Sequence, residues 1–170
     1  MRALVTGGGG FLGKAIVTRL CNKNEMVQTF SRGIYPFLQK WGVKHFRGDL
    51  ADSVALEEAC FGCDVVFHVA AKAGIWGRYN DFYRANVIGT RNVIEACRSV
   101  GISRLVFTSS PSVVFDGRDM EGVDETAPYP QRYKAHYPST KAEAEKLVLN
   151  SNDHELATVA LRPHLIWGPG

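Results

Sequence analysis

Apolar positions along the chain fall into short continuous runs and longer segments in which they recur at helical spacing. The run at residues 64–69 is of the kind required by a strand buried on both faces of a sheet. A longer segment places Val87, Val93, Ile94 and Cys97 on one stripe of a helix. The pattern predicts strands at residues 3–5, 26–30, 43–46, 64–69, 104–108 and 157–161, and helices at residues 11–20, 53–59, 82–100 and 138–149.

The predicted strands and helices alternate, which indicates parallel βαβ units with right-handed crossovers. The predicted fold class is therefore α/β, a Rossmann-type doubly wound parallel sheet in three layers, α/β/α, with strand order 3-2-1-4-5-6. The length predicts a single domain over residues 1–170. Residues 33–41 are expected to form a short irregular or helical link. Residues 117–133 are polar and aperiodic, which predicts a long loop of the kind that is usually functional.

A glycine-rich turn joins the first predicted strand to the first helix, with the sequence TGGGGFLG at residues 6–13. Two registers of a dinucleotide fingerprint fit, beginning at Gly8 or at Gly7, and we prefer Gly7 because it directly follows the strand. Gly7 would allow the tight turn, Gly10 the approach of backbone amides to a pyrophosphate, and Gly13 the close packing of helix on strand. The anion would lie at the helix N-terminus, where unpaired N–H groups and the helix dipole favour it.

Composition narrows the classes of partner. The net charge of +3 is small and the basic residues are scattered, so nothing indicates a nucleic-acid-binding face. No apolar run approaches the ~20 residues that span a bilayer, and the glycine turn leaves no room for a signal peptide, so we expect a cytoplasmic location. Four cysteines are too few for a disulfide framework. Cys60 and Cys63 have CxxC spacing without a second ligand pair, so we favour buried thiols and expect no metal site.

Tyr137 and Lys141 are one helical turn apart, so an ammonium can lie near a phenol. A free tyrosine titrates near ~10, which is too high for efficient acid–base work at neutral pH. A cation within ~4–6 Å favours the phenolate, so we expect Lys141 to lower the pKa of Tyr137. On most helices such a pair simply lies on the solvent-exposed face and has no catalytic role. Here it follows a glycine fingerprint and the serines Ser109 and Ser110, which favours a catalytic role.

Seven motifs along the whole chain carry a family resemblance. The chain resembles the extended short-chain dehydrogenase/reductases of the NAD-dependent epimerase/dehydratase superfamily. It is most similar to their 3β-hydroxysteroid dehydrogenase/sterol dehydrogenase branch. Residues 33–39, 72–77 and 167–170 also resemble bacterial 2-alkyl-3-oxoalkanoate reductases. The motifs are TGGGGFLG at 6–13, GDL at 48–50, HVAA at 68–71, NVIGT at 86–90, TSS at 108–110, YPSTK at 137–141 and LRP at 161–163.

The resemblance implies an NAD(P)-dependent oxidoreductase that transfers hydride between nicotinamide and a secondary alcohol or ketone. The implied substrate is hydrophobic, either 3β-hydroxysteroid-like or a β-keto or β-hydroxy acid. The implied catalytic residues are Tyr137 as general acid or base, Ser110 as hydrogen-bond donor to the substrate carbonyl, and Lys141 as the residue that holds the nicotinamide ribose. Ser109 replaces Ser110 if the register shifts by one. The expected cofactor contacts are Gly7, Gly10, Phe11, Leu12, Gly13, Ser31, Arg32, Asp49, Leu50, Ala70, Ala71, Lys141 and Pro163.

Other interpretations stay open. Asp49 could cap a turn, and Ser110 and Asn86 could satisfy backbone groups. We favour His68 as a core histidine over a catalyst. A nucleotide-sugar epimerase or dehydratase shares every motif, and a non-catalytic dinucleotide-sensing module is the alternative from another class. The complete catalytic set argues against the sensor, and the apolar segment at residues 73–76 favours a lipid-like substrate over a sugar nucleotide.

The second predicted strand is followed by Ser31 and Arg32, where an NAD fingerprint has an acidic residue. A hydroxyl and a guanidinium suit a 2′-phosphate, because arginine pairs with phosphate bidentately. We therefore expect NADP(H) to be favoured, with NAD(H) as the alternative.

Residues 167–170 form an expected turn just after the sixth strand. Enzymes of the family that the chain resembles continue at this point into a smaller substrate-binding domain. We therefore expect residues 1–170 to be a dinucleotide-binding domain with its catalytic helix, and the C-terminal substrate domain to be absent from a truncated chain. The expected partner is a small hydrophobic substrate, and a homodimer is compatible with the resemblance.

Overall fold

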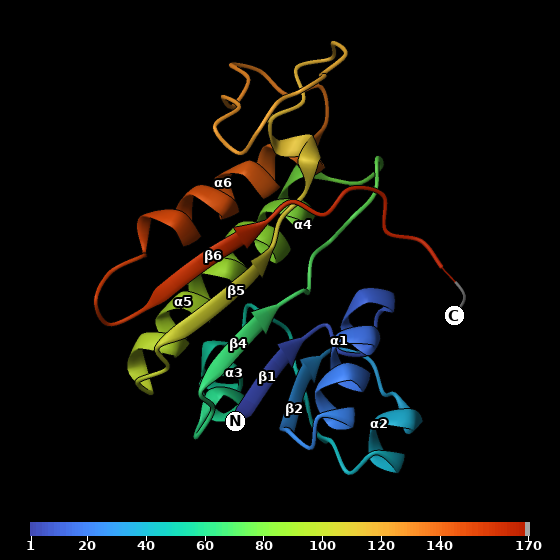
Figure 1. The fold of residues 1–170 in the computed structure, drawn as a ribbon, viewed down its shortest axis with the longest axis vertical. Helices are drawn as coiled ribbons and strands as arrows, with labels where there is room; N and C mark the ends of the chain where they lie inside the picture. The colour runs from blue at the N-terminus through green and yellow to red at the C-terminus, as the bar shows by residue number, and fades with distance from the viewer. Residues whose placement is uncertain (169–170) are drawn as a thin grey trace.

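The computed structural model of the protein describes residues 1–168, so Pro169 and Gly170 of the expected final turn lie outside the described residues. Six parallel strands form one sheet in the order β3-β2-β1-β4-β5-β6, which confirms the predicted fold class and strand order (Figure 1). The strands are β1 (Arg2–Thr6), β2 (Met26–Ser31), β3 (Lys44–Arg47), β4 (Val65–His68), β5 (Arg104–Thr108) and β6 (Ala157–Leu161).

Helices pack on both faces of this sheet and complete the three layers. Hydrophobic residues of α1 and α2 belong to a core cluster on one face, and those of α3, α5 and α6 belong to a cluster on the other. The helices are α1 (Phe11–Asn22), α2 (Pro36–Lys40), α3 (Ser53–Cys60), α4 (Tyr79–Phe82), the π-helical turn η1 (Tyr83–Ile88), α5 (Gly89–Ser99), the 3-10 turn η2 (Pro111–Val113) and α6 (His136–Asn150).

The central strand β1 shows why the strands read as continuous apolar runs. Ala3 and Val5 belong to the cluster under α1 and α2, whereas Leu4 between them belongs to the opposite cluster. All three side chains are fully buried. A strand covered on both faces needs apolar residues at every position, not at alternate positions.

The last strand, β6, is covered on one face only by the described residues. Thr158 Oγ1 donates to the Val148 carbonyl of α6 at 2.9 Å, and Ala160 packs into the core on the same side. Val159 and Leu161, which alternate with them, are 44% and 52% exposed. The face that α1 and α2 cover under β1 and β2 is therefore open at β6.

The helical region around Asn86 differs from the prediction of one helix at residues 82–100. It begins at Tyr79, and the π-helical turn at residues 83–88 interrupts it before α5. Residues 79–81 are exposed and lack apolar periodicity, so the hydrophobic pattern could not predict that the helix begins at Tyr79. Thr90 Oγ1, at the start of α5, donates to the Asn86 carbonyl of this turn at 2.6 Å. Isolated π-helical turns often occur at functional sites.

The helix α6 begins at His136, two residues before the predicted start, and therefore contains both Tyr137 and Lys141. Pro138 falls in its first turn, where no backbone N–H is needed. Residues 117–133 form neither helix nor strand, as predicted. No helix within residues 1–168 has the length and apolar character needed to cross a membrane.

Candidate active site

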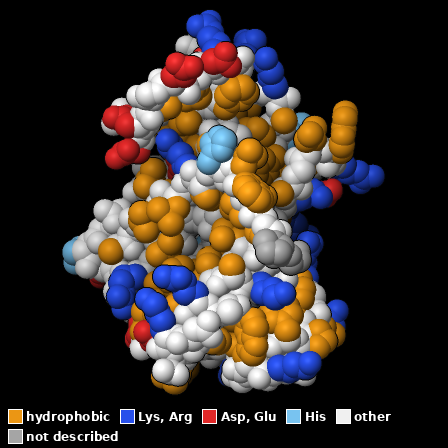
Figure 2. All heavy atoms as spheres, turned by 45° about the vertical axis from the view of Figure 1, so that its right-hand side comes forward, with side chains coloured by type: hydrophobic (Ala, Val, Ile, Leu, Met, Phe, Trp, Pro, Cys, Tyr) orange, Lys and Arg blue, Asp and Glu red, His pale blue; other side chains and the backbone are white. Residues whose placement is uncertain are grey.

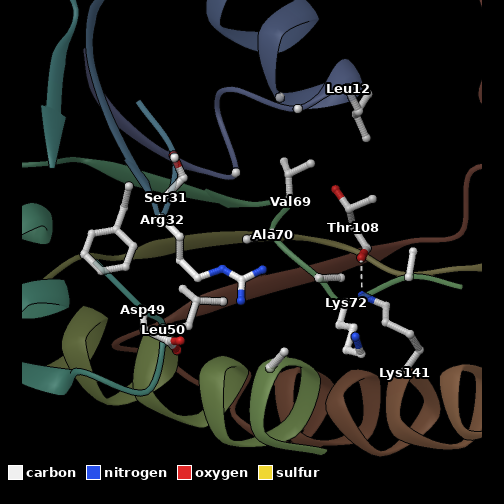
Figure 3. A pocket seen from close by; sticks show the side chains of 18 of the residues that line it. Leu12, Ser31, Arg32, Asp49, Leu50, Val69, Ala70, Lys72, Thr108 and Lys141 are labelled. Carbon is white, nitrogen blue, oxygen red and sulfur yellow. Dashed lines mark hydrogen bonds between the residues drawn. The ribbon is translucent and has the colours of Figure 1, made fainter. Parts of the chain in front are cut away.

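A cavity of about 870 Å³ lies at the carboxyl ends of β1, β2, β4 and β5, which is where doubly wound sheets hold their ligands (Figure 3). Most of the residues expected at a cofactor site line it. Phe11 and Pro163 do not, nor does the expected catalytic serine Ser110, whereas the alternative serine Ser109 does. The expected residues that line the cavity are Gly7, Gly10, Leu12, Gly13, Ser31, Arg32, Asp49, Leu50, Ala70, Ala71, Tyr137 and Lys141.

The glycine turn fits the register that begins at Gly7. This residue directly follows β1 and has a φ of +70°, which favours glycine. A Cβ at Gly13 would overlap the carbonyl oxygen of Gly7, so helix and turn pack without space for a side chain. Gly10 is the N-cap of α1, and no side chain caps the first turn. The amides of that turn are therefore available to an anion in the cavity.

The end of β2 brings a hydroxyl and a guanidinium to the cavity. The Ser31 Oγ atom is buried and has no hydrogen-bond partner within the described part of the chain. Figure 3 shows the Arg32 side chain reaching into the cavity above Asp49. Arg47 Nε donates to the Arg32 carbonyl at 3.0 Å, which ties the strand end to β3. Asp49 Oδ1 accepts from the Ala51 amide at 2.9 Å, so Asp49 caps a turn and also lines the cavity.

Tyr35 is a cavity residue that sequence reasoning missed. A Cβ at Gly9 would overlap the Tyr35 ring, and a Cβ at Gly33 would lie 2.7 Å from its hydroxyl oxygen. The ring therefore packs directly on the glycine turn, beside Arg32 in the cavity wall. The glycines at positions 9 and 33 could have indicated that a large side chain packs against them, but the local sequence does not show that this side chain is Tyr35.

At the opposite end of the cavity, Lys141 adopts a different arrangement from the predicted one. Its Nζ atom donates to the Thr108 carbonyl at 2.7 Å and lies 3.9 Å from the centre of the Phe107 ring. Burial lowers the pKa of Lys141 to about 7, against the opposing charge of Glu145. The ammonium is thus held by the end of β5.

The pKa of Tyr137 is raised, whereas we expected Lys141 to lower it. Burial is the main cause, and a hydrogen bond with Ser110 acts in the opposite direction. The Lys141 ammonium donates to the Thr108 carbonyl instead, and it is not among the causes of the Tyr137 shift. Tyr137 is therefore a protonated phenol at neutral pH, so it holds a proton to donate, but the raised pKa makes it a weaker acid than the predicted pair would be.

The two candidate serines occupy different environments. Ser110 Oγ lies 2.8 Å from Ser112 Oγ, and a hydrogen bond with Ser110 lowers the pKa of Tyr137. Ser109 is buried and lines the cavity, and its Oγ atom has no hydrogen-bond partner within the described residues. The hydrogen bond with Tyr137 favours Ser110, whose Oγ also bonds within the η2 turn, whereas the cavity lining favours Ser109.

Asn86 has the backbone role that was left open for it. Its Oδ1 accepts from the Lys72 amide at 2.7 Å, and its Nδ2 donates to the Lys72 carbonyl and to Thr140 Oγ1. His68 is a core histidine, as favoured, since it is 1% exposed and both ring nitrogens are paired with threonine hydroxyls. Burial lowers the pKa of His68 to about 3, so the ring is neutral.

A buried ion pair lies one helical turn beyond Lys141. Arg162 Nη2 and Nε donate to the Glu145 carboxylate at 2.6 and 3.1 Å, and the Glu145 side chain is fully buried. Tyr129 OH donates to the same carboxylate at 2.6 Å. This network joins α6, the end of β6 and the loop at residues 117–133. The LRP motif at residues 161–163 drew attention to Arg162, but nothing in the local sequence indicated that Glu145 and Tyr129 join it in a network.

The CxxC cysteines are buried thiols, as favoured. Gln28 Nε2 donates to Cys63 Sγ at 3.0 Å. A hydrogen bond with Cys97 and burial raise the pKa of Cys60. Both thiols therefore stay protonated, and they lie away from the cavity lining.

Comparisons with known proteins agree with this geometry. A family model described as the 3-beta hydroxysteroid dehydrogenase/isomerase family matches residues 4–170. The 2-alkyl-3-oxoalkanoate reductase of Stenotrophomonas maltophilia is 54% identical over 172 residues, which cover 100% of this chain and 52% of the relative. Human sterol-4-alpha-carboxylate 3-dehydrogenase, decarboxylating, is 39% identical over 170 residues, which cover 99% of this chain and 45% of the relative.

A solved structure shows the same architecture. The UDP-glucose 4-epimerase of Thermus thermophilus, in complex with NAD, matches with a TM-score of 0.84 and 35% identity over 95% of this chain and 54% of that chain. The present chain spans about half the length of the curated relatives that it matches.

Proposed function

The chain belongs to the 3-beta hydroxysteroid dehydrogenase/isomerase family, and we propose that it is the cofactor-binding and catalytic half of an NAD(P)-dependent reductase or dehydrogenase. The proposed reaction interconverts a 3-oxo and a 3-hydroxy group on a hydrophobic substrate. The observation that carries the proposal is one cavity lined by both the glycine turn and the pair Tyr137 and Lys141.

The cavity suits a nicotinamide dinucleotide, which when bound would supply or accept the hydride. The uncapped first turn of α1 would hold the pyrophosphate, and Gly10 leaves room for its approach. The unpartnered hydroxyl of Ser31 is explained by a ligand at the end of β2. Tyr137 and Lys141 lie at the opposite end of this path, where the reactive ring would be.

The chain's own residues then have separate tasks in the reducing direction. Tyr137 holds the proton that goes to the substrate oxygen, and its raised pKa keeps that proton in place at neutral pH. Ser110 would donate a hydrogen bond to the same oxygen. Lys141, whose pKa of about 7 is set by burial, would orient the ribose.

Exposed apolar side chains support a hydrophobic substrate. Figure 2 shows hydrophobic side chains spread over much of one face of the molecule. The segment after β4 exposes Ile75 and Trp76 at 74% and 87%, and the segment after β6 exposes Leu165 and Trp167 at 80% and 85%. Both segments adjoin cavity residues, Ala73 and Ile166. The solved epimerase supports a nucleotide-sugar enzyme as the second candidate, but these apolar side chains suit a lipid-like substrate better.

The names of the two curated relatives describe a narrower class. A 2-alkyl-3-oxoalkanoate and a 3-hydroxysterol 4-carboxylate both carry a carboxylate on the carbon next to the one that bears the oxygen. We therefore propose β-oxygenated acids as the first substrates to test. In the whole protein, nicotinamide absorbance would follow turnover of a 2-alkyl-3-oxoalkanoate and a 3β-hydroxysterol, and product chromatography would follow conversion of UDP-glucose, which involves no net change in the cofactor. Turnover of UDP-glucose alone would contradict the proposal.

We propose that NADP(H) is preferred, because Arg32 can offer charge-assisted hydrogen bonds to a 2′-phosphate. Dissociation constants measured by calorimetry should favour NADP(H) over NAD(H) by roughly ten- to a hundred-fold. Arg32→Ala should lose that preference. Arg91→Ala, in an exposed arginine of α5 away from the cavity, is the control. Equal affinities in the wild type would rule the preference out.

We also propose that residues outside 1–170 complete the substrate pocket, which is supported by the half-length match and the open face at Val159 and Leu161. Residues 1–170 alone should then bind dinucleotide but turn over substrate poorly. Lost substrate positioning costs several kcal/mol of barrier reduction, roughly two orders of magnitude or more in rate. Calorimetry and steady-state assays on both lengths test this expectation. Equal turnover by the two lengths would contradict it.

A further inference from the structure

We propose that Lys72 binds the carboxylate of the substrate, as the main determinant of specificity for acids over neutral ketones and alcohols. The inference rests on the proposed function and adds to it the residue that recognises the acid group. Lys72 follows β4 and lines the cavity. Figure 3 shows it on the Lys141 side of the cavity, across from Ser31 and Arg32.

The backbone of Lys72 is fixed to the catalytic helix. The Asn86 amide group bonds both the N–H and the C=O of Lys72, at 2.7 and 3.1 Å. Its Nδ2 also donates to Thr140 Oγ1 at 3.0 Å, and Thr140 directly precedes Lys141. Asn86 is 2% exposed, so these bonds are shielded from water. Lys72 therefore has a set position relative to Tyr137 and Lys141, as a recognition residue requires.

The side chain of Lys72 is packed along its stem and has no anionic partner. Its Nζ atom lies 5.1 Å from the centre of the buried Phe82 ring. A Cβ at Gly77 would lie 3.4 Å from Lys72 Cε, so the stem runs past that backbone. Within residues 1–168, neither Lys72 nor Arg84 forms an ion pair with a carboxylate. A held ammonium without a counter-ion suits an anionic ligand group.

The charges around this end of the cavity favour an anion. Lys72, Arg84 and the largely buried Lys141 line it, against the single carboxylate of Asp81. Asp81 and Arg84 are both exposed, so solvent screens both charges, whereas Lys72 is part-buried. The phosphates of the dinucleotide would bind to the first turn of α1 and to Arg32, at the other end of the cavity, so they do not need Lys72. A substrate carboxylate next to the reacting carbon would thus lie beside Lys72, with its alkyl chains toward Ile75 and Trp76.

The test compares a 2-alkyl-3-hydroxyalkanoate with its primary amide, which has the same shape without the charge. Both are assayed as substrates of the whole protein with oxidised cofactor. Lys72→Met should raise KM for the acid about ten- to a hundred-fold and leave KM for the amide and the Kd of the dinucleotide unchanged. Lys72→Arg should restore much of the acid KM. Lys44→Met is the matched control, because Lys44 also lies over a phenylalanine ring but outside the cavity.

The outcomes separate this inference from the proposed function. If Lys72→Met changes the two KM values equally, or weakens the dinucleotide and not the acid, Lys72 is not the carboxylate site. A wild type that oxidises acid and amide with equal KM also overturns the inference and leaves the proposed function standing. A wild type that oxidises neither compound overturns the inference, and it overturns the proposed function as well if a 3β-hydroxysterol is not oxidised either.

Discussion

Replacing Tyr137 with phenylalanine in the whole protein is expected to reduce kcat by ~100- to 10,000-fold while cofactor affinity is kept. The substitution removes only the hydroxyl that would transfer the proton, and general acid–base groups contribute an effect of this size. The phenol is held in its protonated form by burial, which raises its pKa. Steady-state kinetics and dinucleotide calorimetry on the same preparation measure both quantities.

Tyr133→Phe is the matched control for this variant. Tyr133 is also part-buried with a raised pKa, but its hydroxyl donates to the Val113 carbonyl and the residue does not line the cavity. It should keep nearly full activity. If Tyr137→Phe retained half of the wild-type kcat, Tyr137 would not be the proton donor.

The fold was predictable because its signals are local. Each strand of a sheet covered on both faces must be apolar at successive positions, as Ala3, Leu4 and Val5 are. The turn at Gly7 needs a positive φ, which identifies the register of the fingerprint. The start of α4 at Tyr79 was missed because exposed helical residues carry no such constraint.

The arrangement inside the site depends on contacts between distant segments, which spacing alone does not reveal. The i to i+4 spacing correctly placed Tyr137 and Lys141 on one helix. It could not show that the Lys141 ammonium donates to the carbonyl of Thr108, 33 residues earlier. The raised pKa of Tyr137 followed from its burial, which the spacing does not show either. Lys72 was missed for the same reason, because Asn86 lies 14 residues away from it.

Removing only the arginine from the ion pair of Glu145 and Arg162 is expected to destabilise the protein strongly. Arg162→Met would leave the fully buried Glu145 carboxylate without its cation. Breaking a buried pair by removing one partner typically costs about 3–5 kcal/mol, a large part of the stability of a domain. Urea unfolding of the whole protein should therefore show a much lower midpoint for this variant.

Two further variants separate the buried charge from simple loss of packing. Arg98→Met breaks an exposed ion pair with Asp153, with a similar 2.6 Å contact, and should have a far smaller effect. The double variant Glu145→Leu with Arg162→Met removes both charges and should recover much of the loss. If the double variant were as unstable as Arg162→Met alone, the uncompensated carboxylate would not be the cause.

The pH dependence follows from the same pair. Burial alone would raise the pKa of Glu145, but hydrogen bonds led by Arg162 outweigh it and lower the pKa. A lowered pKa means that the carboxylate stabilises the wild type above its unfolded pKa, and that this contribution is lost as pH falls through the folded pKa. In Arg162→Met burial acts unopposed by that cation, so the folded state binds a proton more readily than before. The stability difference between wild type and variant should be largest at neutral pH and should shrink on acidification. A difference that stayed constant from pH 7 to the acid transition would show that lost packing, not charge, explains the variant.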